Sequence, residues 1–228
     1  MTITLTGIGK KFNTEWIFRG ITTTFESGEA VAILGRNGSG KSTFLQVVAG
    51  NIHPTAGRIT YSLNGTTVSD TDIFRHLSLV APYEELIEEF TLDEMLRFHF
   101  SFKSLLKEYS IPGIIDLLAF SQWKSKPIRK YSSGMKQRVK LACAILSDTS
   151  LLFLDEPTTN LDKAGIDWYL ELIHRHHKDR TLIVCSNLQE AESGFCGRRI
   201  QIEDYKETPK SPKGDLLPSP EGEGPGVR

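Results

Sequence analysis

Nine consecutive residues combine the side-chain types that bind phosphate. They fit the pattern G-x-x-x-x-G-K-[ST] and run in the order Gly35, Arg36, Asn37, Gly38, Ser39, Gly40, Lys41, Ser42 and Thr43. Glycines let the backbone turn tightly and bring its N–H groups around phosphate oxygens. Lys41 is expected to reach the β- and γ-phosphates, and the Ser42 hydroxyl is expected to hold Mg²⁺. The apolar run before this stretch, residues 30–34, predicts a strand that feeds a phosphate-binding loop.

Two acidic residues follow a later apolar run. Residues 151–157 read Leu-Leu-Phe-Leu-Asp-Glu-Pro, so Asp155 and Glu156 stand at the end of a predicted strand. A carboxylate beside a phosphate loop can hold Mg²⁺ through water, and Asp155 fits that role. Glu156 can orient or deprotonate a water molecule. The alternative is a strand that ends in a solvated turn, where acids are common.

A third motif lies between these two. Residues 131–138 read Tyr-Ser-Ser-Gly-Met-Lys-Gln-Arg and open a helix that is predicted over residues 136–146. Ser132 and Gly134 would again form a helix N-terminus of the size that binds phosphate. Ser132 could equally act only as the N-cap of that helix.

The order of these motifs resembles that of the ATP-binding cassette (ABC) ATPases, over roughly residues 1–203. In that family two cassettes pair head to tail and enclose two ATP molecules. Residues 131–135 stand where the family has Leu-Ser-Gly-Gly-Gln, which implies that Ser132 and Gly134 touch the γ-phosphate held by the other subunit. The resemblance also implies that Asp155 is the Mg²⁺ acid and that Glu156 is the catalytic base.

Two further positions receive a role from the resemblance. Residues 160–162, Asn-Leu-Asp, match a short loop that contacts the partner cassette, so Asp162 is expected beside the nucleotide. Phe12 stands where an aromatic ring usually stacks on adenine. An ordinary core phenylalanine is the alternative for Phe12.

The sequence departs from the family pattern at two positions. The glutamine that normally follows the strand at residues 77–80, and reaches Mg²⁺ and the attacking water, is replaced by Pro82. The switch histidine that normally follows the strand at residues 181–185 is replaced by Asn187, which can donate a hydrogen bond but carries no charge. Losing one donor at a developing charge can lower a rate by about 10²–10³. Nucleotide binding is therefore better supported than fast hydrolysis.

The pattern of apolar runs and turns predicts an α/β fold: a P-loop NTPase core sheet with an antiparallel β subdomain and a helical subdomain. The core strands are expected near residues 31–34, 77–80, 150–154 and 181–185. Strands at 2–6, 17–25 and 58–63 precede or flank this core, and Asn64-Gly65 predicts a hairpin turn. Residues 86–120 have helical spacing, with a capping box at Thr91. The predicted cassette covers residues 1–205, with its helical subdomain at about 84–135, and the Pro/Gly-rich residues 206–228 are expected to be disordered.

Composition narrows the class of protein. The 228 residues carry a net charge of −1, so no overall basic field points to nucleic acid, and we expect no nucleic-acid partner. No run of about 18 apolar residues is present that could span a membrane. Three cysteines without metal-ligand spacing indicate reduced thiols in a cytosolic protein.

The segment at residues 82–90 is rich in acids. It carries Glu84, Glu85, Glu88 and Glu89 between apolar side chains spaced three to four residues apart. The resemblance places it at the groove that receives a helix of the membrane subunit, so charge could steer a basic partner helix. An amphipathic helix start packed on its own domain is the alternative.

These observations predict the ATP-binding and ATP-hydrolysing subunit of an ABC transporter, with ATP and Mg²⁺ as ligands. Its expected partners are a transmembrane permease subunit and a second cassette, at the cytoplasmic face of the membrane. The chain loosely resembles exporter subunits. The alternatives are a nucleotide-sensing ABC ATPase with weak hydrolysis, which Pro82 and Asn187 favour, or a soluble ABC ATPase without a transport role.

Overall fold

Two β-sheets form the frame of the part of the chain that the computed structural model describes, residues 1–187 and 190–206. The first sheet is antiparallel in the order β2-β1-β4-β5, and the second is parallel in the order β6-β7-β8-β3-β9. Their strands are β1 (Thr2–Phe12), β2 (Glu15–Phe25), β3 (Ala30–Leu34), β4 (Ala56–Leu63), β5 (Thr66–Val68), β6 (Leu77–Val80), β7 (Leu151–Asp155), β8 (Thr181–Ser186) and β9 (Arg198–Gln201). The α/β class predicted from the sequence is confirmed.

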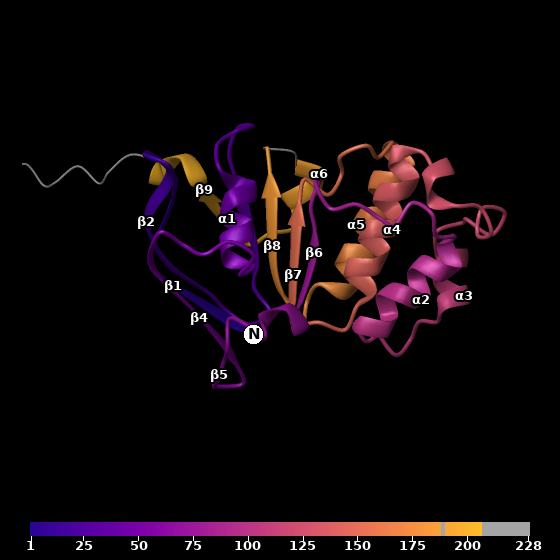
Figure 1. Ribbon diagram of the computed structural model, residues 1–228, viewed down its shortest axis with the longest axis horizontal. Helices are drawn as coiled ribbons and strands as arrows, with labels where there is room; N and C mark the ends of the chain where they lie inside the picture. Colours follow the sequence, from indigo (N-terminus) through magenta and orange to yellow (C-terminus); the bar gives the residue numbers. More distant parts are fainter. Residues whose placement is uncertain (188–189, 207–228) are drawn as a thin grey trace, which may run out of the picture.

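The helices divide between the two faces of the parallel sheet. Figure 1 shows α1 between the two sheets, while α2 and α3 lie at the end of the molecule farthest from the antiparallel sheet. The α-helices are α1 (Lys41–Val48), α2 (Leu92–Phe102), α3 (Ile111–Leu117), α4 (Ser133–Leu146), α5 (Lys163–His176) and α6 (Glu190–Ser193). Three 3₁₀ turns complete the described chain: η1 (Ile73–Arg75), η2 (Ile128–Lys130) and η3 (Ile202–Tyr205).

Alternating side chains of the parallel strands feed two separate hydrophobic cores. Val31, Ile33 and Phe153 pack with α1 and the antiparallel sheet. Ala32 and Leu154 point the other way, toward the apolar residues of α2, α3, α4 and α5. Both faces of the sheet are covered, which is why its strands read as continuous apolar runs.

The Asn64-Gly65 turn joins β4 to β5 as its sequence predicts. Both residues have positive φ, 51° for Asn64 and 82° for Gly65. These values suit the two-residue turn that matches the twist of paired strands. The hairpin prediction is therefore confirmed.

The prediction of helical structure before Thr91 was wrong. The chain at residues 82–91 contains turns and extended backbone, and α2 begins only at Leu92. Thr91 fixes that start, because its side chain accepts from the Glu94 backbone N–H and the Glu94 side chain accepts from the Thr91 N–H. The residues before it bond elsewhere, since the Phe90 carbonyl accepts from the Ile128 N–H at 2.8 Å.

The tail predicted to be disordered falls almost entirely outside the described residues, which end at Lys206. The division into a cassette of residues 1–205 with a helical subdomain at about 84–135 stays a prediction. Among the helices in the described ranges, none is both long and apolar enough to cross a membrane.

Candidate nucleotide-binding site

The phosphate loop connects β3 to α1, as the sequence predicts. Gly40 is the N-cap of α1 and has a φ of 106°, a backbone angle that residues other than glycine rarely adopt. A Cβ atom at Gly40 would also lie 2.5 Å from Ile17 Cγ2, so the site requires glycine for space as well. Sequence reasoning missed Ile17, which comes from β2 and forms part of the loop's surroundings.

Lys41 lies within this loop and is only 4% exposed. Its ammonium donates to the Gly35 carbonyl at 2.9 Å and to the Arg36 carbonyl at 3.2 Å. The same Nζ lies 3.8 Å from Glu156 Oε1. A positive side chain and the predicted base therefore face each other across the start of α1.

A cavity of about 260 Å³ opens at this place. It brings together most of the predicted loop residues and Glu156, and its lining is Ile17, Asn37, Gly38, Ser39, Gly40, Lys41, Ser42, Thr43 and Glu156. Backbone N–H groups at a helix start, a lysine and a hydroxyl suit phosphate oxygens. The electrostatic character of the cavity thus fits a polyphosphate.

Asp155 ends β7 beside the loop and is 1% exposed. Both of its carboxylate oxygens are buried without a hydrogen-bond partner among the described residues. Burial raises the pKa of Asp155 to about 6, and the nearby Ser42 hydroxyl opposes that rise. A buried carboxylate without a partner, beside a serine hydroxyl, supplies the hard oxygen ligands that Mg²⁺ prefers, so these residues fit the ion.

One exposed contact and one buried contact connect the segments that surround the loop. The Asn187 side chain, which follows β8, donates from Nδ2 to Asn37 Oδ1 at 3.3 Å. Glu192 on α6 is fully buried, and it accepts from Thr158 Oγ1 at 2.7 Å and from the Ser186 hydroxyl at 2.5 Å. Sequence reasoning missed Glu192, because its partners lie on two other segments.

Pro82 and Tyr83 follow β6, where the family carries its glutamine. Pro82 is exposed and offers no polar side-chain atom. Burial raises the pKa of Tyr83 above its usual range, and the nearby Asp155 carboxylate adds to that rise. Tyr83 is thus a polar group of this segment that lies close enough to Asp155 to be affected by its charge.

Ser132, Gly134, Asp162 and Phe12 are not among the residues that line the loop cavity in the described chain. Ser132 caps α4 by accepting from the Met135 N–H at 3.2 Å, and Asp162 caps α5. Phe12 is 48% exposed, which excludes the alternative of an ordinary core residue. Their nucleotide-contacting roles, like those of the loop residues, remain predictions.

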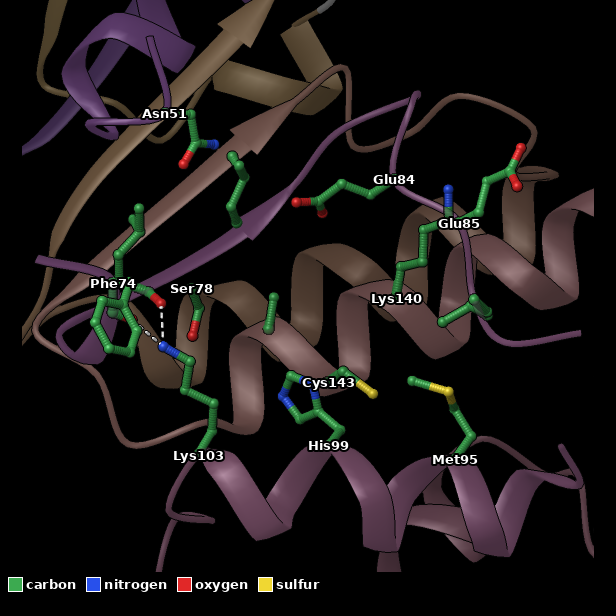
Figure 2. Close-up of a pocket in the computed structure, with 14 residues that line it drawn as sticks. Asn51, Phe74, Ser78, Glu84, Glu85, Met95, His99, Lys103, Lys140 and Cys143 are labelled. Carbon is green, nitrogen blue, oxygen red and sulfur yellow. Dashed lines mark hydrogen bonds between the residues drawn. The ribbon is translucent and has the colours of Figure 1, made fainter. Parts of the chain in front are cut away.

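A second hollow, which we call the α2–α4 groove, opens between the parallel sheet and α2. Figure 2 shows Met95 and His99 of α2, and Lys103 directly after it, pointing into the groove opposite Glu84 and Glu85. Its volume is about 510 Å³, and its lining is Asn51, Phe74, Leu77, Ser78, Leu79, Glu84, Glu85, Leu86, Met95, His99, Lys103, Lys140, Cys143 and Ala144. The predicted acidic segment therefore contributes two of its four glutamates to a groove.

Comparison with known proteins gives consistent results. A family model described as "ABC transporter" matches residues 18–159. The chain is 30% identical to the lipoprotein-releasing system ATP-binding protein LolD 1 of Caulobacter vibrioides, over 84% of this chain and 86% of that protein. It is 30% identical to the Nod factor export ATP-binding protein I of Sinorhizobium fredii over 89% of this chain, but spans only 60% of the length of that relative.

A solved structure shares the fold. The bacterial ABC transporter cassette MJ0796, described as a dimeric structure, superposes with a TM-score of 0.74 at 19% identity, over 88% of this chain and 95% of that one. The family match covers the loop, the Ser132 motif and the strand that ends in Asp155. From its motifs, its fold and these matches, the chain belongs to the ABC transporter family.

Proposed function

We propose that this chain is the ATP-binding and ATP-hydrolysing subunit of an ABC transporter, and that it drives substrate movement through a separate membrane subunit. The observation that carries the proposal is the loop cavity, in which Lys41 and Glu156 stand 3.8 Å apart next to the buried Asp155. The export and release systems named for the two curated relatives favour an exporter. Its place would then be the cytoplasmic face of a membrane.

The residues divide the work of hydrolysis by position. The loop N–H groups and Lys41 hold the phosphates, which aligns the terminal phosphoryl group with Glu156. Ser42 and Asp155 would hold Mg²⁺, which when bound supplies positive charge to the phosphate oxygens. Glu156 accepts a proton from the attacking water, and its φ of 47° turns the side chain off the β7 strand direction toward Lys41.

Substitution of Glu156 tests this assignment. Glu156→Gln keeps the shape of the side chain but removes its capacity to take a proton, so ATP hydrolysis should fall by about 10²–10³ while ATP affinity stays within about threefold. Phosphate release and nucleotide titration measure the two quantities. Hydrolysis at the wild-type rate would show that Glu156 is not the base.

The membrane partner would dock in the α2–α4 groove. Burial raises the pKa of Glu84 to about 7, although the nearby Lys140 ammonium opposes that rise. Lys103 is occupied in holding the carbonyls of Phe74 and Leu77, as the dashed lines in Figure 2 show. A basic, partly apolar helix would add to the positive charge that Lys140 already places beside Glu84 and Glu85.

A second cassette would complete the nucleotide site. Ser132, the exposed N-cap of α4, and the half-buried Gly134 in its first turn lie outside the loop cavity of their own chain, where another copy could contact them. The dimeric cassette that shares this fold is consistent with such pairing. The partner could be a second copy of this chain or a related cassette.

One observation favours a weaker enzyme. Pro82 provides no polar side chain at the glutamine position. Asn187, an uncharged residue at the position of the switch histidine, donates a hydrogen bond to Asn37. A nucleotide sensor that pairs on ATP but hydrolyses slowly would fit these changes. The rate of ATP turnover distinguishes the two: if Asn187→His raises the hydrolysis rate tenfold or more without changing ATP affinity, Asn187 keeps hydrolysis slow in the native site.

A further inference from the structure

The last described turn of the chain, η3, lies against the phosphate loop. This placement follows from the sheet, because β9 pairs in parallel with β3 and Leu34 stands opposite Gln201. The two strands therefore end side by side, and the residues that leave them meet. Glu203 Oε1 accepts a hydrogen bond from the Arg36 backbone N–H at 2.7 Å. A Cβ atom on Gly35 would lie 2.7 Å from Glu203 Oε2, so the carboxylate sits directly on the loop.

A single peptide group receives bonds from both sides. The peptide between Gly35 and Arg36 donates its N–H to Glu203 at 2.7 Å, and its carbonyl accepts from the Lys41 ammonium at 2.9 Å. An acid on the N–H makes the carbonyl a stronger acceptor, because hydrogen bonds in a chain polarise one another. Glu203, the peptide and Lys41 thus form a continuous line of charge and dipole.

We propose that Glu203 is a positioning residue for ATP binding, which holds the 35–36 peptide in one orientation and thereby keeps the phosphate loop and Lys41 ready for phosphate. This rests on the proposed function of the loop. Neither Glu203 nor Arg36 lines the loop cavity in the described residues, so the acid braces the loop from behind and does not compete with phosphate.

The charge of Glu203 is suited to this task. The hydrogen bond from the Arg36 N–H lowers the pKa of Glu203, and the Lys41 charge contributes to the same effect, so the carboxylate is ionised at neutral pH. Bonds from an N–H to a charged acceptor are about twice as strong as neutral ones. A second contact from the same segment, from Lys206 Nζ to the Gly38 carbonyl at 3.4 Å, is longer and exposed.

Removal of the brace should lower the fraction of molecules whose loop is ready. Glu203→Ala leaves the Arg36 N–H without its partner, and the affinity for MgATP should fall about tenfold, in proportion to that fraction. Glu203→Gln keeps an oxygen acceptor and should remain within about threefold of wild type. Asp204→Ala removes a neighbouring exposed acid and is the matched control.

Two measurements on the full chain separate this proposal from the function itself. Without nucleotide, amide hydrogen exchange at Arg36 should be at least about tenfold faster in Glu203→Ala than in wild type or in Glu203→Gln. With nucleotide, calorimetric titration of MgATP should show the matching loss and its rescue by Gln. Unchanged exchange in Glu203→Ala would overturn the brace, whereas a wild-type chain that fails to bind MgATP would overturn the proposed function and leave the exchange result standing.

If Glu203→Ala is too unstable to study, Glu203→Gln decides the matter alone. Its amide can accept from the Arg36 N–H but lacks charge, so Arg36 exchange should rise by no more than about threefold. A rise of about two- to threefold in Arg36 exchange in Glu203→Gln, with a matching loss of MgATP affinity, supports the brace, because both then follow the charge of the acceptor. Exchange that becomes tenfold faster with no change in MgATP affinity would show that the contact does not act on nucleotide binding, and would overturn the proposal.

Discussion

The carboxyl group of Asp155 is buried, and this burial changes its pKa. Its two oxygens lack partners in the described chain, and its pKa rises to about 6 from the ordinary 3.8. The folded protein therefore keeps a proton between about pH 4 and pH 6 that the unfolded chain has already released. Stability must then fall as pH rises through that window, because the native state binds more protons there.

We expect this slope to be measurable. Wild type should lose about 3 kcal/mol relative to Asp155→Asn between about pH 4 and pH 7, since each unit of pKa difference corresponds to about 1.4 kcal/mol. Urea unfolding of both proteins across that range measures the difference. Glu84, whose pKa rises to about 7, produces a slope of the same sign, so Glu84→Gln is the control. Parallel curves for wild type and Asp155→Asn would contradict the assignment.

Functional residues that belong to a short sequence motif could be predicted from the sequence. Residues that contact the site from far away in the sequence could not. Lys41 and Ser42 follow from a nine-residue pattern, and the structure places both on the loop cavity. Glu203 reaches Arg36 across 167 positions, and Ile17 reaches Gly40 from another sheet. No periodicity or propensity encodes such pairs, because they depend on which strands become neighbours.

Helix α4 begins against the loop that follows β7. A Cβ atom on Gly134 would lie 2.7 Å from the Asn160 carbonyl oxygen, although the φ of Gly134 itself is not positive. The methyl group of alanine would raise helix propensity by about 0.5–1 kcal/mol, but a clash with backbone costs about 1–3 kcal/mol. The clash should therefore decide the sign.

We expect Gly134→Ala to lower the free energy of unfolding by about 1–2 kcal/mol in urea titration. Gly197→Ala is the matched control, because a Cβ there meets no atom within 4 Å, and its effect should stay within about 0.5 kcal/mol. A stabilised Gly134→Ala protein would mean that residues 160–162 move aside freely.

The glutamates of the acidic segment at residues 82–90 lie in different surroundings, which the sequence alone does not show. Glu84 and Glu85 line the α2–α4 groove, while Glu88 forms an ion pair with Lys136. The apolar spacing that suggested a helix instead serves an irregular chain that bonds to residues 128 and 129. Helical spacing over six residues is too short to outweigh those pairings and the strong N-cap at Thr91.

Charge reversal in the groove should therefore be selective. The double variant Glu84→Lys with Glu85→Lys should reduce capture of the membrane subunit about tenfold without changing ATP affinity, because it repels a basic partner helix. Glu89→Lys, an exposed change outside the groove lining, is the control. Pull-down of the membrane subunit and nucleotide titration test both halves, and equal capture by all proteins would exclude a charge-based dock.

At the scale of the whole molecule, pairing of two cassettes would place the exposed start of α4 over another copy's loop cavity. Ser132→Arg should fill the space meant for the γ-phosphate and prevent the ATP-driven dimer, while binding of ATP to the single chain changes little. The test is sizing chromatography with ATP in the Glu156→Gln background, which preserves bound nucleotide.

The control is Ser133→Arg, since Ser133 is also exposed but does not cap α4. Loss of the cap in Ser132→Arg costs about 1 kcal/mol, too little to unfold the domain. A normal dimer for Ser132→Arg would reduce Ser132 to a cap.

The two cores on opposite faces of the parallel sheet also decide how mutations combine. Phe153 and Leu154 are adjacent in the chain, yet one packs with α1 and the other with the helices beyond the sheet. Truncations at these two positions should behave as nearly independent perturbations, whereas Phe153 and Phe44, remote in sequence, share one core and should show a coupling energy. Substitutions in one core can then accumulate without compensation in the other, so the side covered by α1 and the side covered by α2 to α5 are free to diversify at different rates.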